Sequence, residues 1–187
     1  MLEDWALDKA SATRTFLRFK GKSYTYRQAY EIVLKYGTYF KQKFGIQKGE
    51  VVAMDFVNSD LFIFVWFGLW SIGAKPAFIN YNLTNKPLSH VIKTSTARYC
   101  FAMQQFEQEK YVGDVLEEIS APNFREAGGP VQVVFWTDAV QAEIAATTPI
   151  RAPDSERGGQ ELKGMAALIY TSGTTGELVV VTIRTYH

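Results

Sequence analysis

Residues 165–176 read Met-Ala-Ala-Leu-Ile-Tyr-Thr-Ser-Gly-Thr-Thr-Gly, and the rest of the chain leads up to this stretch. The apolar run over residues 165–169 predicts a buried strand. The seven residues from Tyr170 to Gly176 hold two glycines, four Ser or Thr hydroxyls and no charge. Glycine lets backbone N–H groups come close to a ligand, and successive amides in such a turn form a concavity that binds phosphate. The stretch therefore predicts a loop that wraps a triphosphate.

Two common phosphate-binding motifs do not fit this stretch. A Walker loop requires a Lys directly after its last glycine, and Gly176 is followed by Glu177. The dinucleotide fingerprint Gly-x-Gly-x-x-Gly is also absent. An ordinary polar turn after a strand is the structural alternative, because Gly, Ser and Thr are frequent in such turns.

The composition indicates a globular chain without a charge signature for nucleic acid. Of its 187 residues, 47% are hydrophobic, and the net charge is +1. Cys100 is the only cysteine, so no intramolecular disulfide can form and a reducing, intracellular compartment is the default expectation. The acidic N-terminus lacks the basic region of a signal peptide. The longest uncharged apolar stretch, 61–74, is shorter than the about 20 residues needed to cross a bilayer.

Alternating strand and helix patterns over residues 50–140 predict an α/β fold, a mostly parallel sheet flanked by helices. An N-terminal β-hairpin is expected around Gly21, followed by an amphipathic helix over 26–44 that Thr25 caps and Gly45 ends. The expected strands and the further helices follow in turn: strands 51–56, 75–79, 98–102 and 131–136, and helices 60–73, from 85, 107–120 and 138–145. Residues 147–163, rich in Pro, Gly and charge, are expected to form a surface connection. Ligands of such sheets bind at the carboxyl ends of strands, where residues 170–176 fall.

The ordered string over residues 170–176 resembles the phosphate loop of the adenylate-forming (AMP-binding) superfamily, which includes acyl-CoA synthetases, luciferases and peptide-synthetase adenylation domains. Residues 79–83, Ile-Asn-Tyr-Asn-Leu, and 87–90, Pro-Leu-Ser-His, are similar to its fatty-acid transport protein branch, the very-long-chain acyl-CoA synthetases. The resemblance covers residues 2–176. It implies that residues 1–187 are a truncated AMP-binding domain, the front part of the large N-terminal domain, ending just after the phosphate loop.

The resemblance also implies a chemistry. In the family, ATP and a fatty acid form an acyl-adenylate, magnesium assists, and CoA then displaces AMP. Nucleotide and fatty acid are therefore the implied partners, and membranes of the endoplasmic reticulum, the peroxisome or the cell surface are the implied location. The residues implied to contact the nucleotide phosphates are Thr171, Ser172, Gly173, Thr174, Thr175 and Gly176.

The chain departs from the family directly after the loop. The family continues with one residue and then Pro-Lys, whereas Glu177 is followed here by Leu178 and Val179. A carboxylate beside the loop should weaken triphosphate binding, because like charges repel. The family's magnesium-holding Glu, ribose-binding Asp and catalytic Lys have no counterpart in the eleven residues after Gly176. We therefore expect a fragment that is inactive alone. A non-catalytic, membrane-associated lipid-uptake or scaffold protein is the alternative, with helix 60–73 lying on a bilayer.

Several other residues are given structural roles. Asn80 and Asn82 are expected to stabilise a turn, and Tyr170 to lie in the core. We expect Trp66 and Trp70, four apart on the apolar helix, to pack in the core rather than bind lipid. No chemistry is assigned to Asp55. His90 is expected to be solvated or structural, and Cys100 to be a buried, inert thiol.

Overall fold

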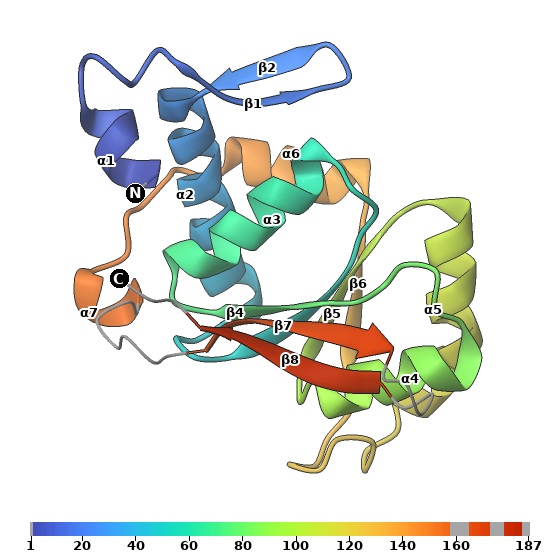
Figure 1. Ribbon diagram of the computed structural model, residues 1–187. Coiled ribbons are helices and arrows are strands. Elements are labelled where there is room, and N and C mark those ends of the chain that lie inside the picture. Colours follow the sequence, from blue (N-terminus) through green and yellow to red (C-terminus); the bar gives the residue numbers. More distant parts are fainter. Residues whose placement is uncertain (1, 158–164, 173–177, 185–187) are drawn as a thin grey trace.

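A six-stranded sheet forms the centre of the molecule in the computed structural model, which describes residues 2–157, 165–172 and 178–184 (Figure 1). The strand order is β6-β5-β3-β4-β7-β8. Five strands are parallel and β8 runs antiparallel to β7. This confirms the predicted mostly parallel sheet. In chain order the strands are β3 (Val51–Asp55), β4 (Lys75–Phe78), β5 (Tyr99–Met103), β6 (Gln132–Trp136), β7 (Met165–Ser172) and β8 (Leu178–Arg184).

Helices cover both faces of this sheet, as the alternating pattern predicted. One face carries α2 (Tyr26–Phe44), α3 (Asp60–Ser71) and α6 (Asp138–Ala146). The opposite face carries α4 (Asn85–Thr94) and α5 (Phe106–Ile119). At the N-terminus, the short helix α1 (Leu2–Leu7) precedes the predicted hairpin of β1 (Thr15–Phe19) and β2 (Lys22–Thr25). Figure 1 shows this hairpin standing beyond α2 and α3, away from the sheet.

The inner strands are apolar on both sides because each side meets helices. On β3, Val52 and Met54 pack with α2 and α3, while Ala53 packs with α4 and α5. On β5, Phe101 packs on the side of α2 and α3, and Cys100 packs on the side of α4 and α5. This accounts for the near-continuous hydrophobic runs in the sequence, which are typical of parallel strands.

The caps predicted for the long helix are present. The hydroxyl of Thr25 accepts a hydrogen bond from the Gln28 amide, at 3.3 Å. The Gln28 side chain in return accepts one from the Thr25 amide, at 2.9 Å. These reciprocal bonds form a capping box. At the other end Gly45 adopts φ 61°, the left-handed conformation that glycine tolerates best.

Replacing Thr25 with alanine should lower the free energy of unfolding by about 1 kcal/mol, because the Gln28 amide at the helix N-terminus would lose its partner. Thr25→Ser is the matched control, since it keeps the accepting oxygen. Urea unfolding of the three chains measures the difference. Equal midpoints for the alanine variant and the parent would show that the capping box does not stabilise α2.

Helix α3 packs closely into the body, as predicted for an apolar helix. All of its residues are buried or half-buried. Gly68 lies against α2, where an added Cβ would be 2.6 Å from the Cβ of Tyr36. On another side the indole of Trp70 donates a hydrogen bond to the Ala166 carbonyl of β7, at 2.8 Å. Of the helices in the described part of the chain, none is long and apolar enough to cross a membrane.

The described part of segment 147–163 lies against the body and contains a short helix, α7 (Asp154–Arg157). Ala152 is buried, and the Thr38 hydroxyl of α2 accepts a hydrogen bond from the amide of Ile150, at 2.9 Å. Arg157 makes an ion pair with Glu3 of α1. These contacts connect the segment to α1 and α2 before the chain enters β7.

Candidate nucleotide site

The candidate site lies at the carboxyl end of β7. This strand is parallel to β4, with Phe78 opposite Ile169. Both strands therefore end at the same edge of the sheet, where α/β proteins bind their ligands. Of the six predicted phosphate contacts, Thr171 and Ser172 are the last two residues of β7. The other four lie outside the described residues: Gly173, Thr174, Thr175 and Gly176.

The structure corrects the predicted boundary between strand and loop. The apolar run suggested that the strand ends at Ile169, but β7 continues to Ser172. The reason is β8, which the sequence reasoning missed. It supplies an antiparallel partner for each added residue, pairing Thr171 with Val179 and Ser172 with Leu178. The Val-rich, β-branched sequence of residues 178–184 was the signal for this strand.

Tyr170, just before these residues, belongs to the core, as predicted. Its side chain is half-buried and packs against the cluster that α4 and α5 form with the sheet. Burial raises the pKa of its hydroxyl to about 12. The Tyr170 side chain therefore packs the end of β7 against the core, and its phenol is neutral at physiological pH.

The turn after β4 lies at the same edge of the sheet. The Asn80 side-chain oxygen accepts a hydrogen bond from the amide of Asn82, at 3.1 Å. The amide of Leu83 donates to the Asn80 carbonyl, at 2.9 Å. Asn80 thus has the turn-stabilising role predicted for it, and both asparagines are exposed.

Gln108, near the start of α5, is a polar residue that the sequence reasoning missed. It is buried, and its side-chain amide nitrogen lies 3.5 Å from the Tyr81 carbonyl in the turn after β4. Its side-chain oxygen is buried without a hydrogen-bond partner among the described residues. No sequence signal distinguished Gln108 from the solvated polar residues around it, because its burial depends on the turn after β4.

Asp55 is a second buried polar residue, at the carboxyl end of β3. Its side chain is 1% exposed, and one carboxylate oxygen has no partner among the described residues. Burial raises its pKa to about 7. The sequence reasoning assigned it no chemistry, although a carboxylate within the apolar run over 51–56 was a visible signal. Asp55 is therefore close to half-protonated near neutral pH.

Cys100 and His90 fit their predicted structural roles. Cys100 is fully buried, and burial together with the nearby Asp55 carboxylate raises the pKa of its thiol. A thiol in that environment is protonated and inert. His90 is exposed on α4. Within residues 2–157, 165–172 and 178–184, no three His, Cys, Asp or Glu side chains are grouped so that they could hold a metal ion.

Trp66 and Trp70 pack with other aromatic rings on α3. Their ring centroids are 4.9 Å apart, and Trp66 is also 4.9 Å from Phe78 of β4. Both indoles are half-buried. Trp70 is further fixed by its hydrogen bond to β7. They therefore connect α3 to the strands that lead to the candidate site, which confirms the predicted core role.

A mostly parallel sheet with helices on both faces places the end of β7, where the predicted phosphate loop begins, at the edge that binds ligands in α/β proteins. The family model described as "AMP-binding enzyme" matches residues 2–186. This chain belongs to that family.

Several of its curated relatives are fatty acid transport proteins. The chain is 32% identical over 163 residues to the very long-chain fatty acid transport protein of Saccharomyces cerevisiae, covering 84% of this chain and 23% of the relative. It is 27% identical over 186 residues to the long-chain fatty acid transport protein 2 of Rattus norvegicus, covering 95% and 29%. The chain thus spans about a quarter of the length of these relatives.

Solved structures agree on the fold. The N-terminal domain of FACL13 from Mycobacterium tuberculosis, determined with an inhibitor bound, superposes with a TM-score of 0.77 at 18% identity. The match covers 98% of this chain and 43% of that one. At this level of identity the likeness shows a shared fold, and residue roles do not transfer from it.

Proposed function

We propose that this chain carries the phosphate-binding front part of an ATP-dependent synthetase for long- or very-long-chain fatty acyl-CoA. The observation that carries the proposal is the string over residues 170–176, which begins on the last residues of β7 at the ligand-binding edge of a parallel sheet. Membership of the AMP-binding family and the relatives' fatty acid transport names support it.

The loop's part in the reaction follows from its composition. Backbone amides and the Ser and Thr hydroxyls over 171–176 would hold the β- and γ-phosphates of ATP. The fatty acid carboxylate would then attack the α-phosphate and release pyrophosphate. Fixed donors that stabilise this developing charge are the usual means of accelerating such transfers. Magnesium would neutralise phosphate charge, and the CoA thiol would then take the acyl group from the adenylate and release AMP.

We further propose that residues 1–187 do not complete this reaction alone. The loop lacks the Pro-Lys that its family carries, and it gains the carboxylate of Glu177. A lysine there would donate charge-assisted hydrogen bonds to phosphate, whereas a glutamate repels it. The chain also spans about a quarter of its relatives' length, 23% of the yeast protein.

A non-catalytic role in lipid uptake at a membrane is the second candidate. The relatives' names as transport proteins favour it. The route first considered, with α3 lying on a bilayer, is opposed by the close packing of that helix. Membranes of the endoplasmic reticulum, the peroxisome or the cell surface are the proposed location for either function.

Replacing Glu177 with glutamine should tighten ATP binding about fivefold. The reason is that Glu177 directly follows the loop in sequence, and removing one like-charge repulsion of about 1 kcal/mol corresponds to about fivefold in affinity. Titration calorimetry with ATP and magnesium measures the affinity. Glu117→Gln is the matched control, because Glu117 is an exposed glutamate on α5 and its replacement should change nothing.

The double variant Thr174→Ala/Thr175→Ala should weaken ATP binding, because it removes two of the loop's hydroxyl donors. If this variant binds ATP as well as the parent chain, the loop does not hold the phosphates and the proposal is wrong. If Glu117→Gln strengthens binding as much as Glu177→Gln does, the effect of Glu177 is not local.

A further inference from the structure

Positive charge is concentrated near the N-terminus of this nearly neutral chain. The protein has 20 Lys and Arg against 19 Asp and Glu, but residues 9–27 contain six of the basic residues and none of the acidic ones. Five of the six lie in residues 14–27, which form the hairpin and the first turn of α2, here called the basic hairpin. Its cations are Arg14, Arg18, Lys20, Lys22 and Arg27.

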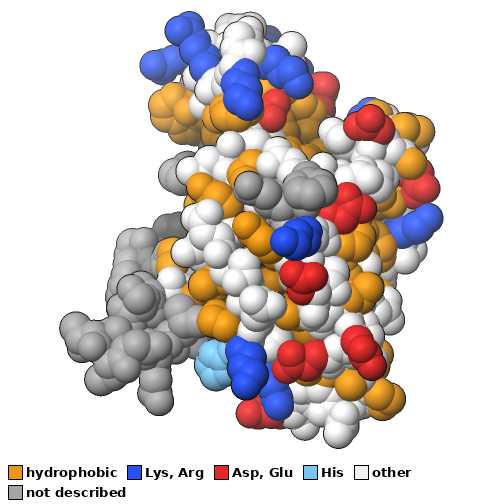
Figure 2. Space-filling model, turned by 90° about the vertical axis from the view of Figure 1, so that its right-hand side faces the viewer, with side chains coloured by type: hydrophobic (Ala, Val, Ile, Leu, Met, Phe, Trp, Pro, Cys, Tyr) orange, Lys and Arg blue, Asp and Glu red, His pale blue; other side chains and the backbone are white. Residues whose placement is uncertain are grey.

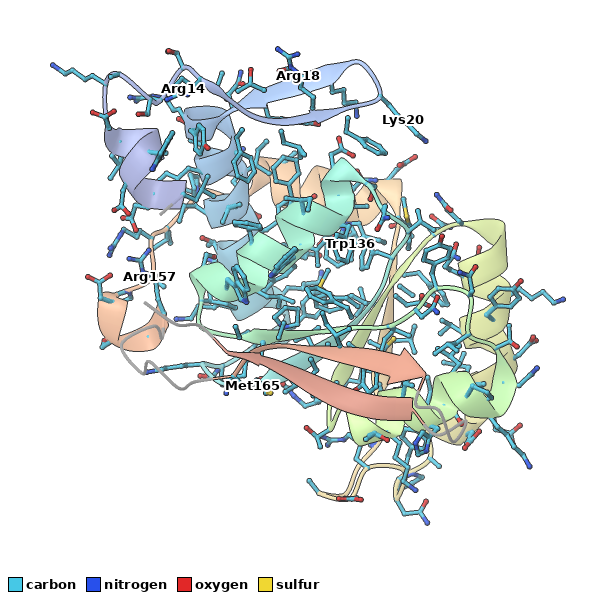
Figure 3. The ribbon with its side chains drawn as sticks, in the orientation of Figure 1. Arg14, Arg18, Lys20, Trp136, Arg157 and Met165 are labelled. Carbon is cyan, nitrogen blue, oxygen red and sulfur yellow. The ribbon has the colours of Figure 1, made fainter. Side chains whose placement is uncertain are left out.

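These cations face solvent at one end of the molecule. All five are exposed. Figure 2 shows Lys and Arg side chains gathered over the hairpin end, and Figure 3 places Arg14, Arg18 and Lys20 along its outer margin. Within the part of the chain that the structure describes, Lys22 is the one cation of the basic hairpin with a salt bridge, to Asp60 at 3.7 Å. The other charges of the hairpin are therefore available to a partner.

The hairpin's position is fixed by its inward side chains, not by its cations. Phe16 packs against Phe67 of α3, with ring centroids 5.7 Å apart. Tyr24 packs against Phe64 of the same helix at 4.9 Å, and its hydroxyl donates a hydrogen bond to Asp60 at 2.6 Å. Because these contacts hold the hairpin on α3, we expect variants that replace Arg18 and Lys20 to stay folded.

Apolar side chains accompany the charge. Trp5 of α1 is 39% exposed, and the guanidinium of Arg14 lies 5.4 Å from its ring centroid. At the hairpin turn, the Lys20 ammonium lies 5.4 Å from the ring of Phe19. Cations next to aromatic rings suit the headgroup region of a bilayer, where cations pair with phosphate groups and aromatic rings lie at the interface.

The acidic groups nearby have other partners. Glu3 pairs with Arg151 and Arg157. The Asp8 carboxylate accepts hydrogen bonds from the amide and the hydroxyl of Ser11. Asp60 is engaged by the hairpin itself. These carboxylates partly offset the positive charge on the α1 side. The excess of positive charge is therefore greatest along the hairpin.

We propose that the basic hairpin is a docking surface for an anionic phospholipid bilayer, with Trp5 at headgroup level. A membrane is favoured over nucleic acid because the exposed ring of Trp5 lies beside the Arg14 cation and the chain as a whole carries a net charge of only +1. This inference is independent of ATP binding and of catalysis. It assigns membrane contact to the hairpin rather than to α3.

The test is co-sedimentation of the whole chain with vesicles of phosphatidylcholine alone or mixed with phosphatidylserine. Binding should require phosphatidylserine and should fall as salt rises, because the Debye length is about 8 Å at physiological ionic strength. Arg18→Gln/Lys20→Gln should weaken binding roughly 30-fold, since each cation near an anionic membrane contributes about fivefold. Lys86→Gln/Lys110→Gln is the matched control. It removes two exposed cations from α4 and α5 and should retain binding.

Circular dichroism of each variant confirms that it is folded before binding is compared. If the two double variants lose vesicle binding equally, the vesicles attract the chain through its net charge rather than through the hairpin, and the proposal is overturned. Absence of binding, or equal binding to phosphatidylcholine alone, would also overturn it. Tighter binding to a single-stranded oligonucleotide than to the vesicles, lost in Arg18→Gln/Lys20→Gln, would assign the surface to nucleic acid instead.

Discussion

A single methyl group added at Gly68 should lower the free energy of unfolding by about 2–3 kcal/mol, the usual cost of overpacking a well-packed core. A Cβ at this position would lie 2.6 Å from the Cβ of Tyr36 and 3.0 Å from the ring of Phe40, both on α2. Neither Tyr36 nor Phe40 can withdraw easily, because both are buried. Intrinsic helix propensity favours alanine over glycine by about 1 kcal/mol, so the steric cost must exceed that gain.

Gly113→Ala is the matched control, because Gly113 is also a helical glycine. A Cβ there meets nothing within 4 Å, and we expect the variant to gain about 0.5–1 kcal/mol from helix propensity. Guanidinium unfolding gives both values. A Gly68→Ala variant as stable as Gly113→Ala would mean that α2 and α3 do not cross as closely as described here.

Replacing Asp55 with asparagine should stabilise the protein above neutral pH and change how its stability depends on pH. The pKa of Asp55 is about 7 in the folded chain, against a reference value of 3.8 for an unperturbed Asp. The folded state therefore binds a proton that the unfolded state has lost, and stability falls as pH rises from about 4 to about 7. Each pKa unit corresponds to about 1.4 kcal/mol, so the loss is at most about 4 kcal/mol.

Asp55→Asn removes this titration and should be more stable than the parent at pH 8 by up to about 4 kcal/mol, with a much smaller advantage at pH 4. Asp114→Asn, at an exposed position on α5, controls for the general loss of a negative charge. Urea unfolding at pH 4, 6 and 8 gives the comparison. If the stability of Asp55→Asn runs parallel to that of the parent across this range, Asp55 does not hold a raised pKa.

The fold could be predicted from sequence where the pattern is local. The βαβ alternation over 50–140 predicted the parallel sheet, and Thr25 and Gly45 predicted both ends of α2. The apolar helix 60–73 was predicted to lie in the core because a helix with no polar face needs cover on all sides. Each of these inferences depends on neighbours within a few positions along the chain.

The features that were missed depend on partners far away in sequence. The last residues of β7 join the sheet because β8 pairs with them. Gln108 is buried because of the turn after β4, 27 positions earlier. Asp55 has a raised pKa because it is buried at the end of β3, beside Ala102 of β5, a neighbour 47 positions away in sequence. For the candidate site, the position of residues 170–176 at the end of a strand was predictable because they directly follow the apolar run over 165–169 in the sequence.

The measurement that tests the central claim most directly is pyrophosphate release that depends on fatty acid, with ATP, magnesium and CoA, run beside a full-length family member. Residues 1–187 should release none above the blank without protein, and restoring Pro-Lys after Gly176 should not change this, because it supplies only one of the missing parts. The opposite result would be turnover by the parent chain that is lost in Thr174→Ala/Thr175→Ala. It would mean that these 187 residues carry a self-sufficient catalytic site.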